Sequence, residues 1–178
     1  MSEKTERYEL LKLQAASLLE NEFDLVANMS NLASLILNSL PDLNGTSFYR
    51  FKDGELILGP FQGKPACMHI AVGSGVCGTV AQNLKSEVVP NVHEFKGHIA
   101  CDSASNSEIV VPIFHDDQFW GVLDLDSPKF NTFDEIDNQY LSDIAPIVFG
   151  VATKGREWDA RSNPKRNWIK GHFSHLQK

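Results

Sequence analysis

Residues 109–126 read IVVPIFHDDQFWGVLDLD, and this stretch decides the fold. Two apolar segments, Ile109–His115 and Phe119–Asp126, flank the short acidic pair Asp116-Asp117. Two apolar runs separated by two turn-forming residues are typical of a β-hairpin. Strands joined this tightly pair antiparallel, because a parallel pair needs a long crossover. The stretch therefore predicts an antiparallel sheet.

The rest of the chain extends this sheet and adds helices. A second hairpin is predicted around Asp53-Gly54, a strong turn signal. Apolar residues at helical spacing predict helices before and after the strands. The order αα-ββ-β-α-β-ββ-α favours an α+β fold, in which helices pack on a largely antiparallel sheet. The further strands expected are Thr46–Lys52, Glu55–Phe61, Ala66–Val72 and Glu87–Val92, and the helices Lys4–Leu19, Asp24–Leu40, Val76–Asn83 and Asp134–Val151.

Length and charge bound the class of protein. The 178 residues, 42% hydrophobic, suit one globular domain with an appendage, which we divide as 1–150 and 151–178. Residues 1–149 carry nine Lys and Arg against 21 Asp and Glu, whereas residues 150–178 carry seven against two. An acidic body argues against nucleic-acid binding. The sequence has no apolar run long enough for a membrane span and no secretory signal at its N-terminus, so we expect a cytoplasmic protein.

The three cysteines, Cys67, Cys77 and Cys101, form no CxxC pair. Their odd number argues against a secreted disulfide framework. Each is therefore a core residue, a metal ligand or a reactive thiol. Cys101 lies in GHIACDSASNSEI (97–109), within a polar segment predicted to be a long loop over 93–107. Loops of that length in a compact domain are usually functional or disordered; the alternative is a surface loop whose cysteine fills a small gap.

Three carboxylates are expected to meet on the predicted sheet. Side chains alternate faces along a strand, which places Asp124 and Asp126 on one face together with Trp120. Glu108 directly precedes the partner strand and should lie near the same end. Like charges this close repel one another, so a cation must complete the cluster. That cation is a metal, an Arg or Lys side chain, or a substrate ammonium.

The sequence carries no strong metal-binding or nucleotide-binding motif beside this cluster. The three cysteines with His98 are zinc ligands by type, but their spacing lacks zinc knuckles. No phosphate-binding GxxxxGK[ST] and no GxSxG nucleophile elbow occurs. Carboxylates raise a thiol's pKa, and a substrate bringing positive charge relieves that effect. A thiol beside a proton-donating carboxyl suits chemistry in which oxygen leaves as water.

Four segments carry a resemblance to a known family. GPFQGKPAC (59–67), GVCGT (75–79), GHIACDSASNSEIVVPI (97–113) and GVLDLDSP (121–128) resemble the free methionine-(R)-sulfoxide reductases, which have a GAF fold. The resemblance covers roughly residues 5–150 and includes all three cysteines. It implies a six-stranded antiparallel sheet with flanking helices, and commonly a homodimer. It also implies a free amino acid as substrate, no bound cofactor or metal, and thioredoxin as the external reductant.

The resemblance also implies roles for individual residues. Cys101 corresponds to the nucleophile, which becomes a sulfenic acid on attacking the sulfoxide. Cys67 corresponds to the thiol that resolves it as a disulfide, with Cys77 as an auxiliary or alternative. The carboxylates are implied to bind the ammonium and protonate the sulfoxide, and an aromatic lines the methyl-group pocket; these are Glu108, Asp124, Asp126 and Tyr49.

Two features depart from the family pattern. The family commonly has NWxGFY where this chain has NGTSFY (44–49), so Gly45 stands in place of a Trp. We predict weaker substrate binding, or replacement of that ring by Trp120, Trp158 or Trp168. The second departure is the basic extension 151–178, predicted to dock on the acidic body of the same or a neighbouring subunit through Trp158, Trp168, Ile169 and Phe173.

Two other classes of protein remain as alternatives. A GAF-type ligand-binding or redox-sensing module would bind without turnover, but such a module is more commonly fused to an output domain. A zinc-binding structural protein would contain stoichiometric metal.

Overall fold

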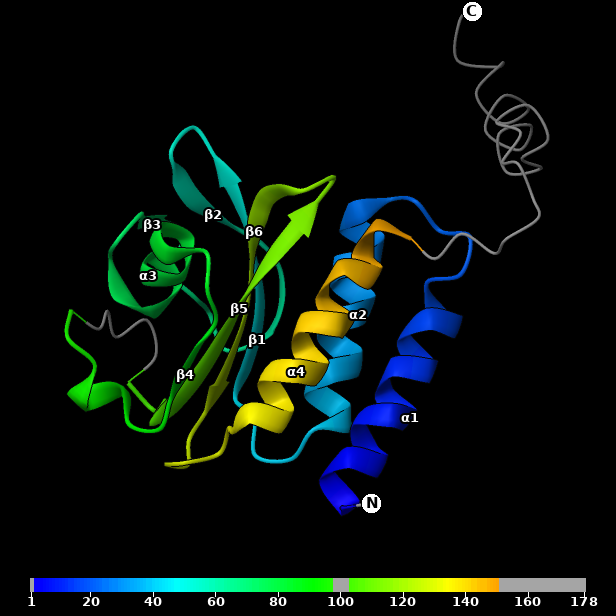
Figure 1. The fold of residues 1–178 in the computed structure, drawn as a ribbon, viewed down its shortest axis with the longest axis horizontal. Helices are drawn as coiled ribbons and strands as arrows, with labels where there is room; N and C mark the ends of the chain where they lie inside the picture. The colour runs from blue at the N-terminus through cyan, green and yellow to red at the C-terminus, as the bar shows by residue number, and fades with distance from the viewer. Residues whose placement is uncertain (1, 98–102, 151–178) are drawn as a thin grey trace, which may run out of the picture.

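The computed structural model describes residues 2–97 and 103–150 (Figure 1). Its centre is a six-stranded sheet in which every neighbouring pair is antiparallel and the strand order is β3-β2-β1-β6-β5-β4. This confirms the predicted α+β fold. The strands are β1 (Gly45–Lys52), β2 (Glu55–Gly63), β3 (His69–Ala71), β4 (Glu87–Val89), β5 (Ser107–His115) and β6 (Gln118–Ser127).

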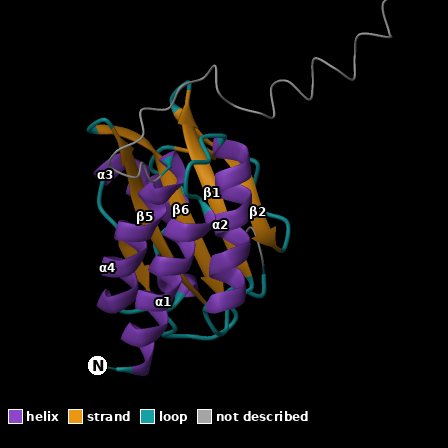
Figure 2. Ribbon diagram, turned by 90° about the vertical axis from the view of Figure 1, so that its right-hand side faces the viewer, coloured by secondary structure: helices purple, strands orange, loops and turns teal. Residues whose placement is uncertain are grey.

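The helices cover the two faces of the sheet unequally. Three long helices lie on one side, where α2 and α4 pack on the sheet and α1 packs on both of them (Figures 1 and 2). The short helix α3 lies on the opposite side. The bounds are α1 (Glu3–Leu18), α2 (Leu25–Ser39), α3 (Gly75–Asn83) and α4 (Glu135–Ile144), with two 3₁₀ segments, η1 (Val92–Glu94) and η2 (Ala145–Phe149).

Local sequence explains where the long helices begin. Asp24 caps α2, its Oδ1 accepting the Ala27 amide at 2.9 Å. Asp134 and Asp137 form a reciprocal capping box at the start of α4. Asp137 also accepts a hydrogen bond from Tyr8 at 2.7 Å, which ties α1 to α4.

The two predicted hairpins form, and their turns set the register of the residues beside them. Asp53 and Gly54 have φ of 52° and 87°, and Asp116 and Asp117 have φ of 49° and 61°. Positive φ at both central residues is the type I′ geometry that matches the twist of paired strands. Further along each hairpin the register shifts by one residue, between Ser47 and Tyr49 on β1 and between Ile113 and Phe114 on β5.

Three predicted elements are shorter in the structure. The strand predicted at Ala66–Val72 forms only at His69–Ala71, and the strand predicted at Glu87–Val92 ends at Val89, where Pro90 has no amide to donate. The helix predicted at Asp134–Val151 ends at Ile144 and continues as a 3₁₀ segment. Pro146 lies in that segment, and proline cannot make the α-helical hydrogen bond.

The sheet separates two hydrophobic clusters. The larger one joins α1, α2 and α4 to Phe48, Leu123 and Leu125. The smaller one lies under α3 and contains Tyr49 and Val122. Residues adjacent in sequence thus contribute to opposite clusters, as the alternation of side chains along a strand requires.

The face of the sheet predicted for Trp120 was wrong. The pairing of β5 with β6 shifts register between Ile113 and Phe114, so Trp120 is an extra residue, as in a β-bulge. Trp120 therefore packs on the larger cluster, and Phe119 on the smaller. The Trp120 ring meets Phe149 edge-on, with centroids 5.4 Å apart. Trp120 consequently does not share the face of Asp124 and Asp126.

Among the described residues, no helix is long and apolar enough to cross a membrane. The extension 151–178, with its predicted docking, lies outside the described residues.

Candidate functional site

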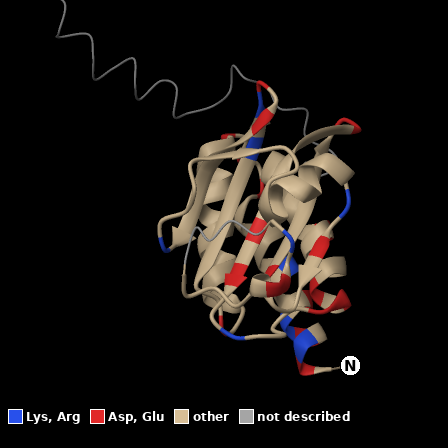
Figure 3. Ribbon diagram, turned by 90° about the vertical axis from the view of Figure 1, so that its left-hand side faces the viewer, with Lys and Arg blue, Asp and Glu red and all other residues tan. Residues whose placement is uncertain are grey.

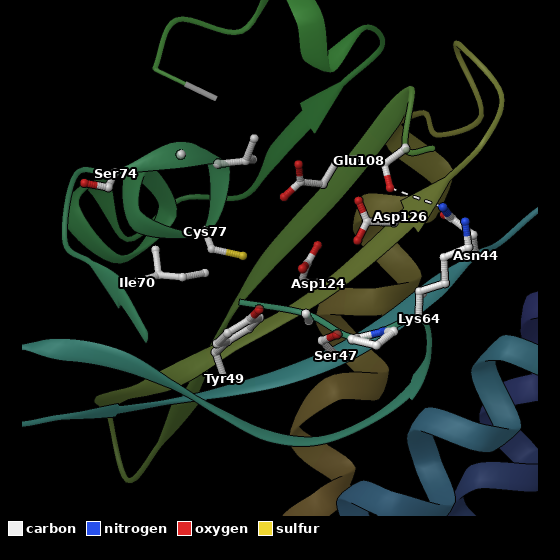
Figure 4. Close-up of a pocket in the computed structure, with 16 residues that line it drawn as sticks. Asn44, Ser47, Tyr49, Lys64, Ile70, Ser74, Cys77, Glu108, Asp124 and Asp126 are labelled. Atoms are coloured by element: carbon white, nitrogen blue, oxygen red, sulfur yellow. Dashed lines mark hydrogen bonds between the residues drawn. The ribbon is translucent and has the colours of Figure 1, made fainter. Parts of the chain in front are cut away.

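A pocket opens between α3 and the sheet (Figure 4). Its floor is made by the face of β1, β6 and β5 that the long helices do not cover. On β1, alternate residues Gly45, Ser47 and Tyr49 line it, as the period of two requires. Cys77, in the first turn of α3, points into it from the other side.

The three predicted carboxylates converge in this pocket. Glu108 on β5 lies opposite Asp126 on β6, and Val110 lies opposite Asp124. The three side chains therefore share one face across two central strands, and all of them line the pocket. Figure 3 marks the acidic segments of the sheet in red. The sequence-based prediction of their meeting is confirmed.

Burial and mutual repulsion disfavour ionisation of these acids. Glu108 and Asp124 are each only 7% exposed. Burial raises the pKa of Glu108 well above its usual range, and the charges of Asp124 and Asp126 raise it further. Burial, followed by the charge of Asp126, likewise raises the pKa of Asp124, although hydrogen bonds from Cys77 and Glu108 partly oppose the shift. These surroundings thus favour the protonated forms of Glu108 and Asp124.

Cys77 is held as a thiol by the same surroundings. It is 4% exposed, and burial raises its pKa well above the usual value, with further contributions from Asp124 and Glu108. A helix N-terminus usually lowers a thiol's pKa, but here burial and the acids outweigh it. The thiol instead lies beside the two buried acids, with one ligand atom each of Cys77, Glu108 and Asp124 within 4.8 Å of one another.

Tyr49 connects the pocket to the Cys67 segment. Its ring is 1% exposed, and its hydroxyl donates to the Cys67 carbonyl at 3.0 Å. Burial raises the pKa of the Tyr49 phenol, with the Asp124 charge adding to the shift, so the hydroxyl remains a donor. Ile70 and Val76 complete an apolar end of the pocket beside this ring.

A buried acceptor remains available at the centre of the pocket. Asp124 Oδ1 has no hydrogen-bond partner among the described residues. A buried oxygen without a donor is costly, so its presence indicates a ligand that brings one. One ligand atom each of Cys77, Glu108 and Asp124 lie within 4.8 Å of one another, which also suits a metal ion in principle. This set differs from the three cysteines with His98 that the sequence suggested.

The remaining sequence-based candidates divide into two groups. Cys67 is half-buried beside the pocket-lining Ala66. Gly45 lines the pocket next to Asp126. Cys101, the predicted nucleophile, lies outside the described residues, as do His98, Trp158 and Trp168.

Several pocket residues were missed by the sequence reasoning. Asn44 Nδ2 donates to Ser105 Oγ at 3.2 Å at one end of the pocket, the bond drawn in Figure 4. Ser47 could have been found, because it lies two residues before Tyr49 on a predicted strand. Nothing in the sequence pattern pointed to Lys64 or Ser105, which come from segments between strands.

Comparisons with known proteins agree with this geometry. Residues 8–148 match the GAF domain family. The chain is 45% identical over 141 residues to the Escherichia coli protein named free methionine-R-sulfoxide reductase, covering 79% of this chain and 86% of that protein. It also resembles the solved structure of fRMsr of Staphylococcus aureus in complex with substrate, with a TM-score of 0.76, 51% identity and coverage of 80% and 93% of the two chains.

A third relative is the free methionine-R-sulfoxide reductase from Neisseria meningitidis, solved in complex with its substrate. Its TM-score is 0.79 at 40% identity, covering 84% of this chain and 90% of that one. Fold and sequence similarity therefore agree on a GAF-domain protein. The chain belongs to the free methionine-R-sulfoxide reductase family.

Proposed function

We propose that this protein reduces free L-methionine-(R)-sulfoxide to methionine. The observation that carries the proposal is the meeting of Glu108, Asp124 and Asp126 in one buried pocket with Tyr49. A small zwitterion supplies what this pocket requires, because its ammonium neutralises the acids and donates to Asp124 Oδ1. The apolar end at Tyr49, Ile70 and Val76 suits the thioether side of the same molecule.

In the proposed reaction, the Cys101 thiolate attacks the sulfoxide sulfur. A carboxyl of the cluster protonates the sulfoxide oxygen. Burial and the neighbouring charges raise the pKa of Glu108, which favours the protonated acid that this step needs. The oxygen is transferred to Cys101 as a sulfenic acid, and methionine leaves with its sulfur reduced by two electrons.

The sulfenic acid is then resolved by Cys67. The Cys67 thiolate attacks the Cys101 sulfur, a disulfide forms, and the hydroxyl group leaves as water after taking up one proton. Cys67 suits this role better than Cys77, because Cys77 is buried and its raised pKa keeps it as a thiol. Thioredoxin then reduces the disulfide with two electrons, and the protein works as a cytoplasmic homodimer.

A coupled assay tests this proposal. NADPH, thioredoxin reductase and thioredoxin are supplied, and NADPH oxidation is followed with the R and S epimers of free methionine sulfoxide separately. We expect turnover of the R epimer alone, and its loss in Cys101→Ser. Cys67→Ser should retain one stoichiometric methionine per chain without continued turnover. Folded protein that binds the sulfoxide but never turns it over would instead identify a sensor.

A further inference from the structure

Gly45 has no structural reason to be glycine. A glycine inside a strand weakens it, so it usually marks a positive φ or a close backbone approach. At Gly45 neither applies, because φ is not in the positive region and an added Cβ would meet only the Asp126 side chain, at 3.5 Å from Oδ2 and 3.7 Å from Cβ. Those are ordinary van der Waals distances.

Every other glycine in the described part of the chain has one of the two reasons. Some have positive φ, and the others approach a backbone atom at 3.0 Å or less from an added Cβ, most closely at Gly121, where the Tyr49 carbonyl would be 2.0 Å away. The positive-φ glycines are Gly54, Gly63, Gly73, Gly75, Gly97 and Gly150, and the closely approached ones are Gly59, Gly78 and Gly121.

The space at Gly45 belongs to the pocket. Gly45 faces the same side as Ser47 and Tyr49 and lies directly opposite Asp126 in the pairing of β1 with β6. On its other side β2 closes in, since an added Cβ at Gly63 would lie 2.3 Å from the Asn44 carbonyl oxygen. The wall there is main chain, which cannot rearrange to fill the space as a side chain could. The space left by the missing side chain is therefore available to a ligand.

We propose that Gly45 sets the specificity of the site at the amine end of its ligand, so that N-alkylated methionine-(R)-sulfoxide is accepted beside the parent amino acid. The inference rests on the proposed function. The ammonium that neutralises the three acids lies next to Gly45 where it meets Asp126, because Gly45 and Asp126 are paired. An N-methyl group leaves the amine cationic, and thus able to neutralise the acids, while occupying about the volume that an alanine Cβ would take.

The test therefore sets a methyl group added to the protein, in Gly45→Ala, against a methyl group added to the substrate nitrogen. Wild type and Gly45→Ala are compared on the R epimers of methionine sulfoxide and N-methylmethionine sulfoxide. An extra methyl in a fitted pocket costs about 10–200-fold in kcat/KM. We expect wild type to use both substrates comparably. In Gly45→Ala, the ratio of kcat/KM for the N-methyl substrate to that for the parent should fall at least about tenfold.

Two controls locate the effect. Thr46→Val alters the next residue of β1, which lies on the opposite face of the strand, and should leave the ratio unchanged. Ethionine sulfoxide, with a larger S-alkyl group, and the methyl ester of methionine sulfoxide probe the other ends of the substrate. If Gly45→Ala discriminates against either of these and spares the N-methyl compound, the space lies elsewhere on the ligand and the inference is overturned.

The two proposals can fail separately. Calorimetry on Cys101→Ser, with and without Gly45→Ala, measures binding of methionine and N-methylmethionine without turnover. Parent turnover with no selective loss of the N-methyl compound in Gly45→Ala refutes only the Gly45 inference. Absence of turnover of any sulfoxide refutes the proposed function, and selective loss of N-methylmethionine binding would still support the role of Gly45.

Discussion

Asp124→Asn should make the ligand-free protein more stable and should weaken its binding of the ligand. Asp124 is buried against Glu108 and Cys77, with ligand atoms within 4.8 Å of one another. At that separation and an effective dielectric constant of about 20, two ionised carboxylates would repel by ~3.5 kcal/mol. Proton uptake relieves part of this, so we expect a gain of about 1–2 kcal/mol in the free energy of unfolding near neutral pH. For a domain of this size that corresponds to a rise in Tm of roughly 2–8 °C.

The gain in the free energy of unfolding should increase with pH. The pKa values of Glu108 and Asp124 are raised in the folded state, so that state binds more protons than the unfolded one. Wild-type stability therefore falls as pH rises above the unfolded carboxyl pKa of about 4. The Tm difference between the variant and wild type should be small near pH 4 and largest at pH 8, measured by calorimetry or dye-based melting.

Ligand binding should move in the opposite direction. A hydrogen bond between the substrate ammonium and the Asp124 carboxylate is worth about 1.5–3 kcal/mol, or roughly 10–150-fold in affinity. Titration calorimetry with free methionine measures this loss. Asp116→Asn is the matched control, since it removes the same charge at a side chain that is 91% exposed in a turn that also favours Asn. An Asp124→Asn variant with lower Tm at pH 8, or with unchanged affinity, would refute the reasoning.

Three further substitutions test the framework of the pocket. Trp120→Ala should lower the free energy of unfolding by about 2–4 kcal/mol, because packing is lost on the helix side of the sheet. KM for the sulfoxide should not change. A large rise in KM would show instead that Trp120 contacts the substrate. Tyr8→Phe removes the 2.7 Å hydrogen bond to Asp137 and should cost about 1 kcal/mol in a denaturant titration with activity retained. Gly121→Ala places a Cβ 2.0 Å from the Tyr49 carbonyl oxygen, so the variant should fail to fold or lose more than about 3 kcal/mol, as seen by circular dichroism and melting; a wild-type melting curve would contradict the close approach.

The acidic site could be predicted because two-residue turns leave little freedom. The Asp116-Asp117 turn brings Glu108 and Asp126 to the same end of β5 and β6. Their direct pairing also needs the bulge at Trp120, because the register beside the turn would pair Glu108 with Leu125. Period-two alternation then placed Asp124 on the same face. A tight turn and alternation are both local properties, which a sequence displays directly.

Trp120 could not be placed in the same way. A bulge adds one residue to one strand, and that residue reverses the alternation for everything beyond it. Phe119 and Trp120 are both large and apolar, so either ring suits either cluster by composition. The segments that close the pocket, with Lys64 and Ser105, follow from how β2 ends and how the chain returns to β5. Such contacts depend on tertiary packing and carry no periodic signal.

The alternation of side chains between the two faces of the sheet has an evolutionary consequence. Because successive residues of β1, β5 and β6 alternate between a helix-covered face and the α3 face, the sheet works as a partition between what keeps the protein folded and what it recognises. Mutations at every second position can retune the recognised molecule while the scaffold behind the partition continues to pack as before. New chemistry on this architecture therefore needs changes on one side only.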